Sequence, residues 1–163
     1  MSITVEAGAS HVYLHGGRVY VAAERCLITT IVVSSVAVGI WDMRGGVGGM
    51  NHYMLPGAIG SESGNTPRYA SIAMNNLLEK LLAAGGQPRF LRAKIFGGAQ
   101  HSHSEINGTI RDLGFRNASL ARERLAAAGI PILEECLGGT SGRKIIFRTD
   151  DGWSEVTEMP RGQ

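Results

Sequence analysis

The sequence contains little cysteine and no long run of apolar residues. Cys26 and Cys136 are the only cysteines in 163 residues. Two cysteines are too few for a disulfide framework, and these two lack metal-type spacing, so both are expected to be reduced thiols. No apolar stretch approaches the roughly 20 residues needed to span a bilayer, and residues 1–5 do not begin a signal peptide. The sequence therefore predicts a cytoplasmic protein without membrane insertion.

Clustered charge of one sign is also absent. The formal net charge is +2, and the 16 Lys and Arg residues are scattered along the chain. A nucleic-acid-binding protein would show a basic patch, so that class is set aside. The glycine pairs form neither a Walker motif nor a GxGxxG motif that opens a helix, so no nucleotide cofactor is expected. The chain is 44% hydrophobic and contains no repeats or linkers. This composition indicates one globular domain over residues 1–163.

Runs of β-branched and apolar residues predict a sheet in the first third of the chain. Residues 12–14 and 19–21 flank a glycine-containing turn and indicate two short strands around it. Further strands are expected at residues 27–33, 36–41 and 47–55. Later runs of the same kind predict strands at residues 89–96, 130–136, 144–149 and 153–156.

Two segments show helical periodicity. Thr66 and Pro67 have the form of an N-cap and a first helical residue, and leucines then recur at helical spacing until residues 85–86, a glycine pair. A second helix is expected at residues 117–128, which Gly129 would end. The pattern therefore predicts an α/β (α+β) protein with mixed sheets and two helices packed on one face.

Ser35 and His52 form the first candidate for chemistry. The run from Thr29 to Ser35 would be a strand ending at a turn, and His52 would lie on a neighbouring strand about 4.8 Å away. Nucleophilic catalysis needs a histidine that accepts the nucleophile's proton and a third group that fixes the imidazole. From spacing alone, a surface hydroxyl and a satisfied core histidine are the commoner explanation.

Several motifs together give the chain a family resemblance. They occur at residues 29–41, 48–56 (GGMNHYMLP), 68–70, 93–99 (AKIFGGA), 114–117 and 137–139. In order and spacing they resemble the chemoreceptor glutamine deamidase family, CheD. The resemblance implies a three-layer α/β/β sandwich like that of deamidating bacterial toxins. It also implies a Cys-His-Thr set that hydrolyses glutamine side chains of methyl-accepting chemotaxis receptors, without a cofactor, and a CheC-type phosphatase as a further partner.

Carried over by position, the resemblance makes His52 the base and Thr29 the group that orients it, but Ser35 stands where the family has its cysteine nucleophile. A hydroxyl has a far higher pKa than a thiol, so a large loss of activity is expected. Val33 also replaces a family glycine. Two explanations for Ser35 stay open, an introduced Cys-to-Ser change and natural divergence, and Val33 favours divergence. The alternative function is a homologue that binds receptors or a CheC-type phosphatase without turnover.

A second candidate is the cluster of His101, His103 and Glu105. Alternating histidines followed by a carboxylate can bind zinc, but no distant fourth ligand accompanies them. A solvated polar loop is the simpler interpretation, and contact with substrate is a third. No metal site is therefore predicted.

Overall fold

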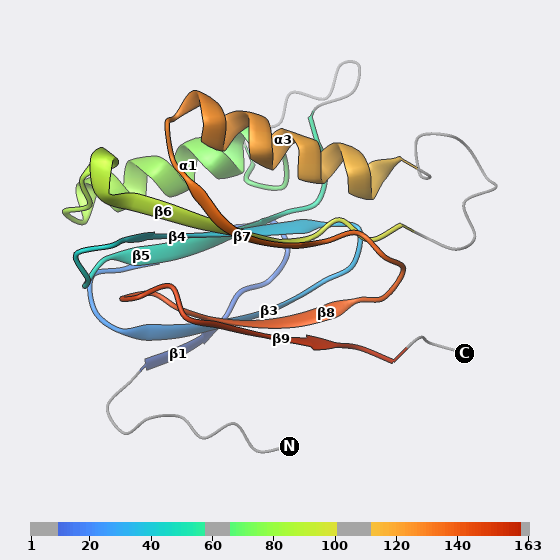
Figure 1. The fold of residues 1–163 in the computed structure, drawn as a ribbon, viewed down its shortest axis with the longest axis horizontal. Coiled ribbons are helices and arrows are strands. Elements are labelled where there is room, and N and C mark those ends of the chain that lie inside the picture. Colours follow the sequence, from blue (N-terminus) through green and yellow to red (C-terminus); the bar gives the residue numbers. More distant parts are fainter. Residues whose placement is uncertain (1–9, 58–65, 101–111, 161–163) are drawn as a thin grey trace.

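The computed structural model describes residues 10–57, 66–100 and 112–160. Three layers are stacked in it (Figure 1). Two helices cover one face of a five-stranded sheet, here called the inner sheet, and the other face packs on a four-stranded sheet, here called the outer sheet. The α/β/β sandwich implied by the family resemblance is thus confirmed. No helix within the described ranges is long and apolar enough to cross a membrane.

The inner sheet is the middle layer, between the helices and the outer sheet (Figure 1). Its strands, in spatial order, are β2 (Arg18–Ala22), β5 (Gly48–Tyr53), β4 (Val36–Asp42), β6 (Leu91–Gly97) and β7 (Ile132–Leu137). Only the β6/β7 pair is parallel. Every residue of β4 is buried, because alternate side chains point to opposite faces and both faces are covered. Val36 and Val38 face the helices, whereas Ala37 and Trp41 face the outer sheet.

The outer sheet contains β1 (Ser10–Tyr13), β3 (Cys26–Val32), β8 (Arg143–Arg148) and β9 (Ser154–Glu158), in that order. Two pairings expected from the sequence are wrong. β1 and β2 do not pair around their turn, because β1 joins β3 in the outer sheet and β2 joins β5 in the inner one. β3 and β5 are not neighbours in one sheet either, since they belong to different layers.

The two predicted helices are α1 (Ala70–Ala83) and α3 (Leu113–Ala127). α1 does not begin at Thr66 as the capping pattern predicted. The carbonyl of Arg68 accepts hydrogen bonds from the backbone of Met54 and Leu55, which keeps residues 66–69 in a turn and a β-bridge, so that the helix begins only at Ala70. α3 begins one turn earlier than expected. A short 3-10 helix, Pro88–Phe90, leads into β6.

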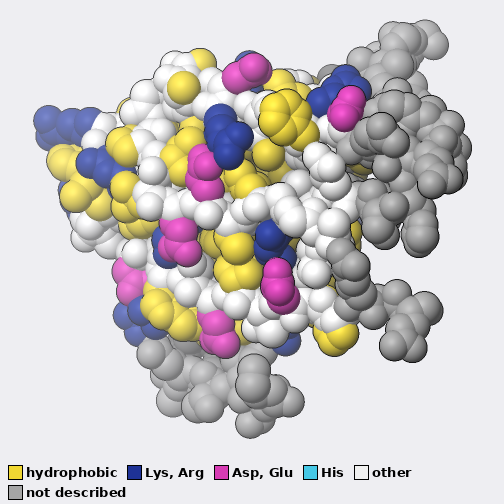
Figure 2. All heavy atoms as spheres, turned by 45° about the vertical axis from the view of Figure 1, so that its right-hand side comes forward, with side chains coloured by type: hydrophobic (Ala, Val, Ile, Leu, Met, Phe, Trp, Pro, Cys, Tyr) yellow, Lys and Arg dark blue, Asp and Glu magenta, His cyan; other side chains and the backbone are white. Residues whose placement is uncertain are grey.

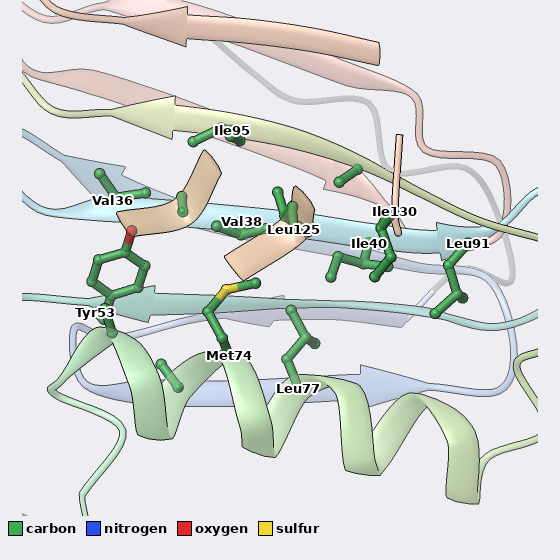
Figure 3. Close-up of a cluster of buried hydrophobic side chains, with 14 of the residues drawn as sticks. Val36, Val38, Ile40, Tyr53, Met74, Leu77, Leu91, Ile95, Leu125 and Ile130 are labelled. Carbon is green, nitrogen blue, oxygen red and sulfur yellow. The ribbon is translucent and has the colours of Figure 1, made fainter. Parts of the chain in front are cut away.

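The larger core lies between the helices and the inner sheet. In Figure 3, Val36, Val38 and Ile40 of the sheet face Met74 and Leu77 of α1. Packing on both faces fixes β4 and β5 in place, and Ser35 directly precedes β4 while His52 lies on β5. On the face shown in Figure 2, acidic, basic and apolar side chains are interspersed.

Candidate active site

Ser35 lies in the turn that takes the chain from β3 in the outer sheet to β4 in the inner sheet. Backbone groups of the segment after β6 hold this turn: Ala99 N–H donates to Val33 O (2.7 Å), and Gly98 N–H donates to Ser35 O (3.0 Å). Gly97 has a φ of 114°, and a Cβ there would collide with the Ser35 carbonyl. Glycine at position 97 therefore permits the close approach that supports the turn.

His52 faces Ser35 from the neighbouring strand of the inner sheet. Side chains alternate along β5. His52 and Met50 therefore point towards the outer sheet, whereas Tyr53 points to the helices. His52 Nε2 lies 2.8 Å from Ser35 Oγ. Both residues are buried, with 5% and 6% of their surface exposed. The structure thus brings together the serine and the histidine that the sequence paired.

Thr30, on β3, holds the other nitrogen of the imidazole. Its Oγ1 lies 2.8 Å from His52 Nδ1 and donates its own proton to Leu14 O at 2.6 Å. Since the hydroxyl has one proton to give, its contact with the histidine must be as an acceptor. The proton of the neutral imidazole therefore lies on Nδ1, which leaves the Nε2 lone pair directed at Ser35 Oγ.

Thr29 does not occupy the position predicted for it. Its neighbour Thr30 contacts His52, while Thr29 Oγ1 lies 2.7 Å from His11 Nε2. The physical reason is the pleat of β3, which directs consecutive side chains to opposite faces. The contact with the histidine also crosses between the two sheets, so it is not the within-sheet contact that strand spacing suggested.

Burial controls the charge of the histidine. Loss of solvation lowers the pKa of His52 from its ordinary 6.5 to about 4, although the Leu14 carbonyl nearby favours the charged form. The imidazole is therefore neutral at pH 7. A neutral imidazole with a free Nε2 can accept the proton of a hydroxyl, which is the requirement for a general base acting on serine.

A backbone N–H without a described acceptor lies beside the Ser35 hydroxyl. Within the described part of the chain, the N–H of Ser35 has no hydrogen-bond acceptor. In acyl transfer, an N–H of this kind can stabilise the negative oxygen of a tetrahedral intermediate. The N–H and the hydroxyl of Ser35 thus lie at one turn, and the His52 imidazole faces that turn from β5.

Two of the site's contacts were not anticipated from the sequence. The sequence does not distinguish Thr30 from Thr29, because both are buried on the same strand. Asn117 of α3 belongs to the motif at residues 114–117, and its side-chain amide donates to Ser34 O at 3.0 Å. The sequence signal for Asn117 is its position on the apolar face of the helix, one turn from Ala121.

Val33, which stands where the family has a glycine, does not adopt the left-handed backbone conformation that favours glycine, because no described non-glycine residue has a positive φ.

Cys26 is buried at the opposite end of β3 from the Ser35 turn. His101, His103 and Glu105 fall outside the described residues. Among the residues that are described, no group of three His, Cys, Asp or Glu side chains could hold a metal ion.

Comparison with known proteins places the chain in a family. The family model described as CheD chemotactic sensory transduction matches residues 54–158. A probable chemoreceptor glutamine deamidase CheD of Trichlorobacter lovleyi is 46% identical over 151 residues, which cover 93% of this chain and 90% of that protein. A second protein with this description, CheD 1 of Anaeromyxobacter dehalogenans, is 40% identical over 93% of this chain and 86% of its own length. The chain belongs to the CheD family.

The family model does not extend over Ser35 and His52, whereas the alignments with the two relatives cover 93% of the chain. The matched range begins after His52, so it includes both helices and the strands from β6 to β9. Ser35 and His52 precede that range. What the CheD-matched part contributes to the site is support, through the Gly98 and Ala99 backbone and through Asn117.

Proposed function

We propose that this CheD-family protein hydrolyses the side-chain amide of glutamine residues in chemoreceptors, giving glutamate and ammonia, with Ser35 as the nucleophile. The observation that carries the proposal is the 2.8 Å contact between Ser35 Oγ and His52 Nε2, with the Nδ1 proton engaged by Thr30. The names of the relatives, probable chemoreceptor glutamine deamidases, support the substrate class.

The first half of the reaction forms an ester. Ser35 Oγ attacks the carboxamide carbon while its proton passes to His52 Nε2, and the carbonyl oxygen becomes an oxyanion near the Ser35 N–H. The imidazolium then gives its proton to the leaving nitrogen, the C–N bond breaks, and ammonia departs. Thr30 keeps the ring oriented throughout, since its oxygen accepts from Nδ1–H.

The second half regenerates the enzyme. Water gives a proton to His52 and attacks the ester carbon, and the second tetrahedral intermediate collapses with release of glutamate and reprotonation of Ser35 Oγ. No carboxylate contacts His52 among the described residues, so the transient imidazolium has only a neutral hydroxyl as its partner. Turnover by the serine protein is therefore expected to be slow.

The neutral histidine suits serine chemistry in particular. A cysteine nucleophile can rest as a thiolate beside a charged imidazole, whereas a hydroxyl has no resting alkoxide and loses its proton only during attack. The base must then be neutral beforehand, and burial of His52 keeps it so.

The test is incubation with cytoplasmic fragments of chemoreceptors, followed by mass spectrometry of glutamine-to-glutamate conversion. The native chain is compared with Ser35→Cys, Ser35→Ala and His52→Gln. We expect slow conversion by the native chain, faster conversion by Ser35→Cys and none by the other two.

Conversion by Ser35→Ala at the native rate would refute Ser35 as the nucleophile. Conversion by Ser35→Cys alone would favour the alternative function, in which the serine protein binds receptors or a CheC-type phosphatase without turnover. Absence of conversion by native and Ser35→Cys proteins alike would refute the deamidase proposal.

A further inference from the structure

Asn117 has an environment that packing alone does not explain. Its side chain is fully buried on α3, at 0% exposure. The Nδ2 group donates to Ser34 O and to Met54 O, each at 3.0 Å, while Oδ1 has no partner among the described residues. A buried amide oxygen without a partner is destabilising, so the residue is poorly suited to a purely structural role on an apolar helix face.

The two carbonyls that Asn117 holds come from the two segments that carry the reacting side chains. Ser34 directly precedes the nucleophile, and Met54 lies two residues after His52. The same helix position accepts a hydrogen bond from Tyr53 Oη through its backbone carbonyl. Asn117 therefore fastens the nucleophile turn to the end of the base-bearing strand.

The Ser34 carbonyl also sets the direction of the Ser35 N–H, because both belong to one planar trans peptide and point in opposite directions. Asn117 draws that carbonyl towards the helix layer, so the N–H points away from the helices. The Ser35 hydroxyl lies on the face of the inner sheet from which the His52 side chain projects. The N–H without an acceptor thus projects on the catalytic side.

Of the three turn carbonyls, only this one depends on a side chain. Val33 O and Ser35 O are held by the backbone N–H groups of Ala99 and Gly98, which no simple substitution removes. Ser34 O is held by the carboxamide of Asn117. Gly114 lets α3 approach closely enough for this contact, because a Cβ there would collide with the carbonyls of Gly98 and Ala99.

We infer that Asn117 is a positioning residue, which orients the Ser34–Ser35 peptide so that the Ser35 N–H serves as the oxyanion donor. The inference rests on the proposed acyl transfer at position 35 and deepens it. It predicts a selective defect: without the carboxamide, steps that create an oxyanion slow down, while steps that need only the nucleophile and His52 do not.

The experiment compares two reactions of the same thiol in a Ser35→Cys background. Iodoacetamide alkylates the thiol by direct displacement and creates no oxyanion, whereas p-nitrophenyl acetate acylates it through a tetrahedral oxyanion. The native chain, with Ser35, supplies the blank for Cys26 and Cys136. Neither reagent requires a chemoreceptor, so the ratio of the two rates is measurable even if the deamidase proposal fails.

Asn117→Leu removes the amide at similar volume, and Asn117→Ser removes it without overpacking in case the leucine variant does not fold. Thr149→Val is the matched control, because Thr149 is a fully buried hydroxyl that joins Cys26 N and Glu24 O far along β3 from the turn. We expect the Asn117 variants to lower acylation by about 10²–10³-fold, the effect of losing one oxyanion donor, with alkylation and its pH profile nearly unchanged. The control should leave the ratio unchanged.

Three results would overturn the inference. A parallel fall of both rates would show a general structural role, and an unchanged ratio would show that the peptide is oriented without Asn117. A parent Ser35→Cys protein whose acylation-to-alkylation ratio equals that of glutathione would show that no oxyanion donor operates. Receptor deamidation by the same parent reports separately on the proposed function.

Discussion

Replacing Thr30 by valine tests how the site fixes the histidine. Valine has nearly the same shape, so the change removes one oxygen and leaves the packing of β3 in place. Two buried groups then lose their partner, the Nδ1–H of His52 and the carbonyl of Leu14. Thr29→Val is the matched control, because it alters the adjacent residue of the same strand and removes only a part-buried contact with His11.

The expected loss of stability follows from those contacts. An unsatisfied buried group costs about 1–3 kcal/mol, and the ring can recover part of this by changing tautomer, so Thr30→Val should lower the free energy of unfolding by about 2–4 kcal/mol. The Thr29→Val change should cost about 1 kcal/mol, as for an ordinary hydrogen bond. Urea unfolding at pH 7 measures both.

The loss of activity should be larger than the loss of stability suggests. Without Thr30, the Nδ1–H loses its hydroxyl acceptor and the Nε2–H tautomer becomes more populated, and that tautomer cannot accept the nucleophile's proton. General base catalysis contributes on the order of 10²–10⁴-fold, so deamidation or ester acylation should fall within that range. Thr29→Val should retain the parent rate within a few fold.

The tautomer itself can be observed. Nitrogen-15 NMR of labelled histidine distinguishes a protonated Nδ1 from a protonated Nε2, and the His52 signal is assigned by its loss in His52→Gln. We expect Nδ1–H in the parent and in Thr29→Val, and loss of that preference in Thr30→Val. An unchanged tautomer in Thr30→Val, or equal loss of activity in both threonine variants, would refute the assignment of Thr30 as the orienting group.

Two further predictions concern stability. Burial lowers the pKa of His52 to about 4. Between pH 6.5 and 4 the unfolded chain therefore binds a proton at this residue that the folded chain does not bind. The neutral His52 contributes about 3 kcal/mol to the free energy of unfolding above pH 6.5, and this contribution is lost as the pH falls towards 4. Urea unfolding across this range should show a shallower pH dependence for His52→Gln, and equal slopes would contradict the lowered pKa. Gly97→Ala and Gly85→Ala both place a side chain at positive φ, a strain of roughly 1–2 kcal/mol, but only the former also drives a Cβ into the Ser35 carbonyl. Gly97→Ala should therefore destabilise more and abolish activity, whereas full activity in that variant would show that the turn tolerates displacement.

The strands and the end of α1 were predictable because their signals are local. β-branched runs gave β3, β4 and β8 to within one or two residues, and α1 ends at Ala83, just before Gly85. The layer to which each strand belongs was not predictable. β3 and β4 are joined by a short turn and still enter different sheets, since alternation of side chains does not specify which layer a strand joins.

The candidate site was likewise predictable only in part. The family resemblance paired Ser35 with His52, and the structure places their reactive atoms in hydrogen-bond contact. To choose between Thr29 and Thr30, one must know which face of β3 points towards the inner sheet. The strand is buried on both faces, so its sequence lacks the alternation of polar and apolar residues that would indicate this. Asn117 lies 82 residues beyond Ser35 in sequence, and only the packing of α3 on the inner sheet brings it to the turn.

The division of the candidate site between the two sheets makes its geometry depend on how one sheet docks on the other. Thr30 belongs to the outer sheet and His52 to the inner one, so neither sheet alone contains an oriented base. A compact intermediate with both sheets formed but loosely docked would keep most of the secondary structure and have no working site. Enzymatic activity would then report the registry of the two sheets, which measurements of helix and strand content do not detect.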